Sequence, residues 1–337
     1  MKYAKIVLCC AVLLLILGVG VLLGMKRECA QDETVSTENI APQETSKWKP
    51  RRLTYSPYVL NDSAQSYLGG DYALYCKAVD SILNYDGKVS GFKNEEQFNK
   101  IWTILIRDFC LYKKLCPTFS NSEEPFVYHD GTVQFSFLLD EKRHEETISQ
   151  FEKKINEAMS RVNADDSEVE TLDKLYYRVS TTMDAGESTG LLYDSIMNGK
   201  GSDKDSAQYL ELLLNHVGIE CMTAFSIDQE HDEPGSFWVV AKLDGQYYHF
   251  DPFLQQTFET WYWFGVGDTL RHNSLGHDWI EMIMTGENPE KLQLPIDCIR
   301  IYGCWDDAKG TYTEVPACPN SYCSNTRGPN SRPSEWQ

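Results

Sequence analysis

Three side chains in the middle of the chain, Asp203, Ser236 and Asp251, have types and spacing that could serve nucleophilic or carboxylate chemistry. Asp203 follows a glycine-rich turn and opens a stretch whose apolar residues recur at helical spacing. A group at a helix N-terminus faces free N–H groups and the positive end of the helix dipole, which stabilise negative charge. A thiolate nucleophile would be activated there, but a carboxylate is a good cap and a poor acyl acceptor. The simplest interpretation of Ser202, Asp203 and Asp205 is an N-cap followed by first-turn acids.

The other two candidates lie on two apolar, aromatic-rich runs joined by Asp244-Gly245, a strong signal for a two-residue hairpin loop. If those two residues form the loop, Leu243 lies opposite Gln246. Counting outward, Trp238 lies opposite Asp251. The sequence therefore predicts an antiparallel pair of strands with a defined register.

Ser236, Trp238 and Asp251 share one face of that pair, because side chains alternate along a strand. Ser236 is then diagonal to Asp251 at roughly 7 to 8 Å between backbones, which a long ring such as histidine can span and a serine cannot. Such a hairpin could hold an imidazole against a carboxylate. The sequence supplies no imidazole at this place.

This order of motifs resembles the transglutaminase-like family, whose motifs are approximately G-x-G-x-C-x-x-x-A, then H-A-W-N, then D-G-x-Y-Y-x-x-D. By position, the family's catalytic cysteine falls on Asp203, its histidine on Ser236 and its aspartate on Asp251, so only the aspartate is kept. The resemblance extends over residues 126–284 and includes the aromatic stretch Trp261–Phe264 and the run His277–Trp279.

The resemblance implies a papain-like α+β core, in which a helix bearing the nucleophile packs on an antiparallel sheet bearing histidine and aspartate. It also implies chemistry on amide bonds, since many extracytoplasmic bacterial members act on peptides or cell-wall material. Because two reactive side chains are missing, we expect an inactive domain whose cleft binds peptide or cell-envelope polymer. Further residues expected to line this cleft are Gly201, Ser202, Trp238 and His231.

Two other functions stay open. One is a diverged amidase, peptidase or acyltransferase with non-standard site residues, such as Asp203 and Asp251 acting as a carboxylate pair, which would need one raised pKa. The other is a stacking platform for sugar or peptide formed by exposed rings of Trp261–Trp263, for which burial in the core is the alternative.

No other residue supplies a convincing catalytic pair. Cys221 opens an apolar run, where a cysteine is usually a small buried hydrophobe. His231 lies in a polar loop, and His249 pairs near Val240 and so points toward the hairpin tip. Ser236 lacks a placed base. A different thiol and imidazole brought together in the same crevice would overturn the expectation of inactivity.

Composition excludes several classes of partner. The 337 residues are 42% hydrophobic and 12% aromatic, which is enough for one or two proper cores. The net charge of −19, from 50 acids and 31 bases, argues against nucleic acid, which would need a basic footprint. The glycine-rich turn lacks the Lys and Ser/Thr pair of a phosphate-binding loop, and no cysteine spacing matches zinc. We therefore predict no cofactor and no metal.

The N-terminus predicts a membrane anchor. Ile6–Met25 is an uninterrupted apolar run flanked by basic residues, long enough to span a bilayer and without a signal-peptidase site. We therefore expect residues 1–29 to form an uncleaved single-pass signal anchor, with the folded part outside the cytoplasm. Eight cysteines follow in the body of the chain, four of them crowded into the C-terminal tail, which favours some tail disulfides in that compartment.

Patterning divides the rest of the chain into four parts. Residues 30–52 are polar and proline-containing, which is typical of a disordered linker. Residues 53–125 form a helical N-terminal region with predicted helices at 66–84 and 95–115. Residues 126–297 form the transglutaminase-like domain, which starts with a predicted hairpin and continues with amphipathic helices, one of them opened by a capping box at Ser167. Residues 298–337 form a Cys-rich tail.

Overall fold

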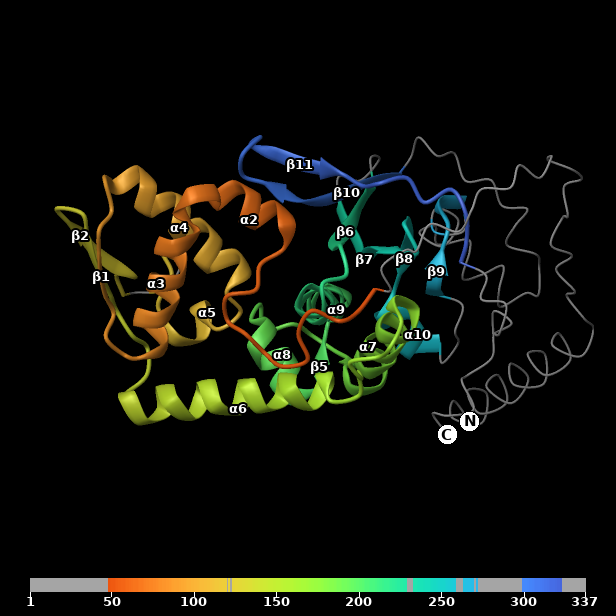
Figure 1. Ribbon diagram of the computed structural model, residues 1–337, viewed down its shortest axis with the longest axis horizontal. Coiled ribbons are helices and arrows are strands. Elements are labelled where there is room, and N and C mark those ends of the chain that lie inside the picture. The colour runs from red at the N-terminus through yellow and green to blue at the C-terminus, as the bar shows by residue number, and fades with distance from the viewer. Residues whose placement is uncertain are drawn as a thin grey trace, which may run out of the picture.

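The computed structural model describes residues 48–119, 121, 123–228, 233–258, 263–269, 271 and 299–322 (Figure 1). Helices and a small sheet form one end of the described chain, and a larger sheet with its own helices forms the other. The long helix α6 (Glu141–Met159) runs beneath both parts (Figure 1).

The N-terminal part contains short helices packed on a three-stranded antiparallel sheet of order β1-β3-β2. Its elements are α2 (Asp62–Leu68), η1 (Gly69–Asp71), α3 (Tyr72–Leu83), β1 (Lys88–Ser90), α4 (Glu95–Asp108), α5 (Tyr112–Leu115), β2 (Phe126–His129) and β3 (Thr132–Phe135).

The two helices predicted in this part are each broken in the structure. The first begins earlier, with Asn61 as N-cap, and α2 ends at Leu68, where the C-cap Gly69 has a φ of 52° and a ψ of −121° that suit glycine. The second stops at Asp108, because Phe109 takes an extended conformation before α5 begins. Apolar spacing continues through both breaks, which explains why periodicity alone predicted single helices.

The hairpin predicted at Phe126 is confirmed. Its two loop residues, Asp130 and Gly131, both have positive φ, as a type I′ turn requires. The hairpin pairs through β3 with β1, so it belongs to the N-terminal sheet, whereas the predicted domain boundary at residue 126 would separate it from that strand. The boundary at residue 126 is predicted from the extent of the family resemblance. The pairing of β3 with β1 joins segments about 40 residues apart, and local sequence patterns do not indicate it.

The larger part is a six-stranded antiparallel sheet of order β11-β10-β6-β7-β8-β9, with α9 packed against β6 and β7. Its remaining elements are α7 (Glu168–Thr182), β4 (Asp184–Ala185), α8 (Leu192–Asn198), β5 (Lys200–Gly201), α9 (Asp203–Val217), β6 (Cys221–Asp228), β7 (Glu233–Leu243), β8 (Gln246–Phe250), α10 (Pro252–Phe258), β9 (Phe264–Val266), β10 (Ile299–Asp306) and β11 (Thr311–Glu314).

Helices and antiparallel sheets thus build a mixed fold, with a helix on a sheet as the sequence predicts. The predicted capping box at Ser167 is present. The Ser167 side chain accepts a hydrogen bond from the N–H of Glu170, and the Glu170 carboxylate accepts one from the N–H of Ser167. Alternate residues of β7 and β8, such as Val239 and Phe250, join α9 in one hydrophobic core that continues into the N-terminal helices.

Several sequence predictions concern residues outside the described part. Ile6–Met25 and His231 are among them, and no helix within the described residues is long and apolar enough to cross a membrane. Trp263 is buried, with a relative exposure of 1%, while Trp261 and Tyr262 are not described.

The expectation of disulfides finds no support in the described cysteines. Cys76, Cys110, Cys116 and the tail residue Cys318 form no disulfide bond. The other tail cysteines are at positions 298, 304 and 323, and their side chains lie outside the described part of the structure.

Candidate functional site

Helix α9 presents Asp203 at its first turn. Ser202 is the N-cap, and a capping box joins it to Asp205: the Ser202 Oγ accepts from the Asp205 N–H at 3.3 Å, and the Asp205 carboxylate accepts from the Ser202 N–H at 2.9 Å. Gly201 precedes them, and a Cβ at this position would lie 2.8 Å from the Asp205 side chain. The predicted N-cap and first-turn acids are therefore confirmed, and a glycine is needed for the cap to close.

The carboxylate of Asp203 is already engaged by the backbone. One oxygen accepts from the N–H of Lys204 at 2.7 Å, and the other accepts from the N–H of Phe237 on β7 at 2.9 Å. Burial raises the pKa of Asp203, and these two N–H groups oppose the rise. Asp203 therefore ties the start of the helix to the neighbouring strand.

The predicted hairpin register is confirmed, with Leu243 opposite Gln246 and Val240 opposite His249. Trp238 follows in the same alternation and is fully buried, while Ser236, two residues before it, is half-buried on β7. Asp251 comes immediately after β8 and caps α10, because its carboxylate accepts from the N–H of Leu254 at 2.9 Å.

The partner of Asp251 is a guanidinium rather than an imidazole. Arg271 Nη1 donates to Asp251 Oδ2 at 2.8 Å, and both side chains are almost completely buried. Burial raises the pKa of Asp251, while the positive charge of Arg271 opposes that rise. Tyr176 adds a hydrogen bond from its hydroxyl to the Asp251 carbonyl at 2.9 Å.

The same guanidinium also acts on Trp238 and Asp203. Its central carbon lies 3.8 Å from the centroid of the Trp238 ring, and its charge also acts on Asp203. Arginine stays protonated in proteins, so it cannot accept a proton from a nucleophile. Asp203, Arg271 and Asp251 thus form a charge cluster that contains neither a thiol nor an imidazole.

A thiol and an imidazole do come close together nearby. The ligand atoms of His249, Asp268 and Cys318 all lie within 4.8 Å of one another, a grouping that could also hold a metal ion. This arrangement is the one that would overturn the expectation of inactivity, so its protonation state matters.

The hydrogen bonds around His249 fix its tautomer. Trp238 Nε1, which can only donate, donates to His249 Nδ1 at 2.9 Å, so the ring proton lies on Nε2, 3.0 Å from Asp268 Oδ1. A neutral histidine that binds a metal through Nε2 needs its proton on Nδ1, where the indole N–H points. The pattern therefore favours a histidine that donates to Asp268 over a metal ligand.

The thiol is also in the wrong state for catalysis. Cys318 is fully buried, and burial, followed by the charge of Asp268, raises the pKa of its thiol to about 12. A nucleophilic cysteine needs a lowered pKa and access to substrate. The Cys318 N–H donates to Asp268 at 2.8 Å, so this cluster attaches the C-terminal segment to the sheet. Cys221, the other candidate thiol, is buried as predicted.

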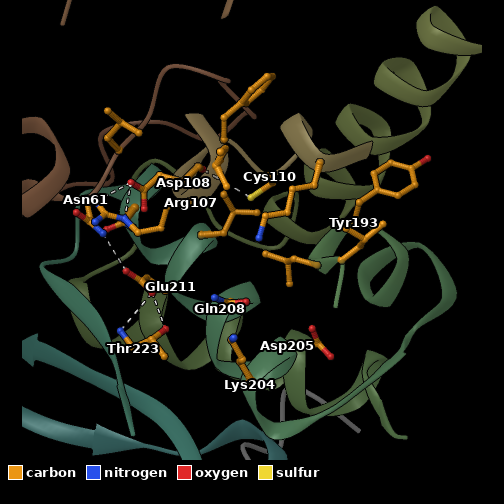
Figure 2. Close-up of a pocket in the computed structure, with 18 of the residues that line it drawn as sticks. Asn61, Arg107, Asp108, Cys110, Tyr193, Lys204, Asp205, Gln208, Glu211 and Thr223 are labelled. Carbon is orange, nitrogen blue, oxygen red and sulfur yellow. Dashed lines mark hydrogen bonds and ion pairs between the residues drawn. The ribbon is translucent and has the colours of Figure 1, made fainter. Parts of the chain in front are cut away.

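A pocket of about 320 Å³ lies beside the N-terminal turn of α9, between that helix and the N-terminal part (Figure 2). Lys204, Gln208 and Glu211 line it from successive turns of α9, and Figure 2 shows Lys204 and Gln208 directed toward the same space. The region between α4 and α5 forms the opposite wall. Lys204 is adjacent to Asp203 in sequence, so the pocket and the charge cluster begin at neighbouring residues.

The acids deep in this pocket are already bonded. Glu211 accepts from the Thr223 hydroxyl at 2.5 Å and from Asn61 at 3.3 Å, and burial raises its pKa. Asp108 binds Arg107 at 2.9 Å, and Arg107 also pairs with Asp307 beyond β10. These contacts hold the strand pair β10–β11 against the N-terminal helices.

Sequence reasoning missed both the guanidinium and the pocket. Arg271 stands in a stretch with no periodic pattern, and the bases that line the pocket come from helices far apart in the chain. Only the adjacency of Lys204 to Asp203 gave a signal, because it places an ammonium group at the same helix end.

No family model and no curated protein matches this chain. Among solved structures, it is similar to a Parabacteroides distasonis protein provisionally described as a protease, with 13% identity, coverage of 40% of this chain and 37% of the other, and a TM-score of 0.25. A protein described as a TGase matches with 10% identity, coverage of 49% and 48%, and a TM-score of 0.26. The chain thus spans less than half the length of either structure, and its function has to be argued from its own site.

Proposed function

We propose that this chain is a membrane-anchored, extracytoplasmic protein whose transglutaminase-like domain binds peptide or cell-envelope polymer without catalysing a reaction. The observation that carries the proposal is the ion pair of Arg271 with Asp251, beside a Trp238 ring and an Asp203 carboxylate already bonded to two backbone N–H groups. Acyl transfer of the family's type needs a thiol nucleophile and an imidazole base, and these residues provide neither a thiol nor an imidazole.

The mixed fold and the motif order support assignment to the transglutaminase-like group. α9 packs on the antiparallel sheet, its N-terminal turn contacts β7 through Asp203, and Asp251 directly follows the neighbouring strand β8. The apolar run at Ile6–Met25 supports the anchor, because it is long enough for a bilayer and is flanked by basic residues.

The catalytic part of the proposal is tested with the full-length chain purified in detergent. Glutamine-containing peptides are incubated with it, with and without a primary amine, and both hydrolysis and amine incorporation are followed by mass spectrometry. We expect no turnover above the buffer blank. Turnover that disappears in Asp203→Ala would refute inactivity and support the diverged enzyme.

The binding part is tested by co-sedimentation of the same preparation with insoluble cell-envelope polymer. We expect saturable retention in the pellet that peptide fragments of the polymer reduce. Retention that fragments do not reduce, or no retention, would remove envelope material as the partner.

A further inference from the structure

Two ammonium groups at the pocket beside α9 have no acidic partner within the described residues. Lys113 lies on α5 and Lys204 on α9, and both side chains are exposed at the pocket wall. Their neighbour Lys114 behaves differently, because it binds Asp194 at 2.8 Å and lies 4.9 Å from the Tyr193 ring centroid. One lysine of this wall is thus neutralised by the protein, and two are not.

The two free ammonium groups act on each other. The pocket wall covers part of the Lys113 side chain, and this partial burial lowers its pKa, which the charge of Lys204 lowers further. Like charges held near one another at a cavity are relieved when an anion binds between them.

The acids of the pocket do not provide that anion. Asp108 is held by Arg107, and Asp205 is held in the capping box with Ser202. Glu211 accepts from Thr223 and Asn61, and burial raises its pKa, which disfavours its charge. The described acids of the pocket therefore leave the ammonium groups of Lys113 and Lys204 available to an anionic ligand.

The remaining walls are suited to an apolar group joined to an amide. Phe225 and Phe237 stack with their ring centroids 5.6 Å apart, and Lys204 Nζ lies 5.6 Å from the Phe237 ring centroid. Gln208 and Asn215 also line the pocket from α9. Its volume of about 320 Å³ falls within the range of small-ligand sites, roughly 300 to 1,000 Å³.

We propose that this pocket binds a peptide carboxylate, with the ammonium groups of Lys113 and Lys204 on the carboxylate and an adjoining apolar side chain against Phe237. This inference rests on the proposed function as a binding domain and names its ligand class and its site. It places recognition beside the charge cluster of Asp203, Arg271 and Asp251, not within it.

The test is calorimetric titration of the full-length chain in detergent with N-acetyl-Gly-Phe, once with a free carboxylate and once amidated. We expect the free acid to bind and the amide to bind at least tenfold more weakly. The double variant Lys113→Gln/Lys204→Gln should lose the difference between the two peptides. Equal affinity of the two peptides for the wild-type chain, or no binding of the free acid, would overturn the proposal.

Lys142→Gln is the matched control, because Lys142 lies on α6 outside the pocket and 85% of its side chain is exposed. It should bind the free acid as the wild type does. A loss as large as that of the double variant would show unspecific charge attraction and contradict the proposal. Mass spectrometry of the recovered peptide separates the two claims: binding with hydrolysis supports the pocket and refutes inactivity, whereas absent binding refutes the pocket and leaves inactivity standing.

Discussion

The charge cluster around Asp251 and the pocket beside Lys204 begin at adjacent residues of α9, but they differ in whether their charged side chains are paired with an opposite charge. In the cluster, the buried acid has a buried counterion, since Arg271 donates to Asp251 at 2.8 Å. At the pocket, Lys113 and Lys204 lie beside an open volume with no acid of the described residues to neutralise them.

This difference separates structural from functional charge. A buried pair whose charges neutralise each other holds elements together, and leaving one partner alone would be costly. An exposed charge beside a cavity costs the fold little and can be used in binding. The place where the family resemblance predicts catalysis is of the first kind, and the neighbouring pocket is of the second.

The largest effect should come from breaking the internal pair. Arg271→Ala leaves the Asp251 carboxylate buried without its counterion, so we expect a loss of about 3–5 kcal/mol in the free energy of unfolding. Urea unfolding followed by circular dichroism measures it. Arg143→Ala is the control, because Arg143 pairs with Asp140 at the surface, at 3.5 Å, and should change stability by about 0–1 kcal/mol. Similar losses in both variants would contradict a structural role for the cluster.

A smaller effect should follow from removing one donor in the network beside it. Trp238→Phe keeps an aromatic ring under Arg271 but leaves His249 Nδ1 without the indole N–H, so we expect a loss of about 1–3 kcal/mol. Trp305→Phe is the comparison, since that ring is 42% exposed and should cost under about 0.5 kcal/mol. If the two variants were equally stable, the hydrogen bond to His249 would not contribute.

The acid within the pocket gives a test that depends on pH. Burial raises the pKa of Glu211 in the folded state. The stability that neutral Glu211 contributes is therefore complete below the unfolded-state pKa, and it is lost as the pH rises through the folded-state pKa. Glu211→Gln cannot ionise. We therefore expect the stability of this variant relative to wild type to improve from pH 5 to pH 8, measured by urea unfolding at both values. If the stability of the variant relative to wild type stayed constant or fell between these pH values, burial would not disfavour the ionised form of Glu211.

Local signals made part of this arrangement predictable from sequence. The register of β7 and β8 follows from the two-residue loop Asp244-Gly245, and the start of α9 follows from the cap at Ser202. These features depend on neighbours within a few residues, so the placement of Asp203 and Asp251 could be derived.

The rest depends on contacts between distant segments. Nothing in the sequence around Arg271 indicates that its guanidinium reaches Asp251, because only the folded chain brings them together. The same holds for Lys113, which joins Lys204 at one pocket wall from a different helix, and for the pairing of β1 with β3. Gly69 shows the converse case, since a local backbone conformation there breaks a helix that apolar periodicity predicts to be continuous.

The smallest effect should come from the pocket lysines themselves, and it sharpens the comparison from the other side. Lys113→Gln and Lys204→Gln remove charges that no described acid neutralises, so each should change the free energy of unfolding by less than about 0.5 kcal/mol. The sign should be slightly favourable, because each variant relieves the repulsion that lowers the pKa of Lys113. Urea unfolding of the single and double variants measures this. A loss of several kcal/mol, comparable to that of Arg271→Ala, would show that the fold depends on these lysines. A charge that the fold needs for its stability is not available to bind a ligand, so this result would remove the distinction between the two regions.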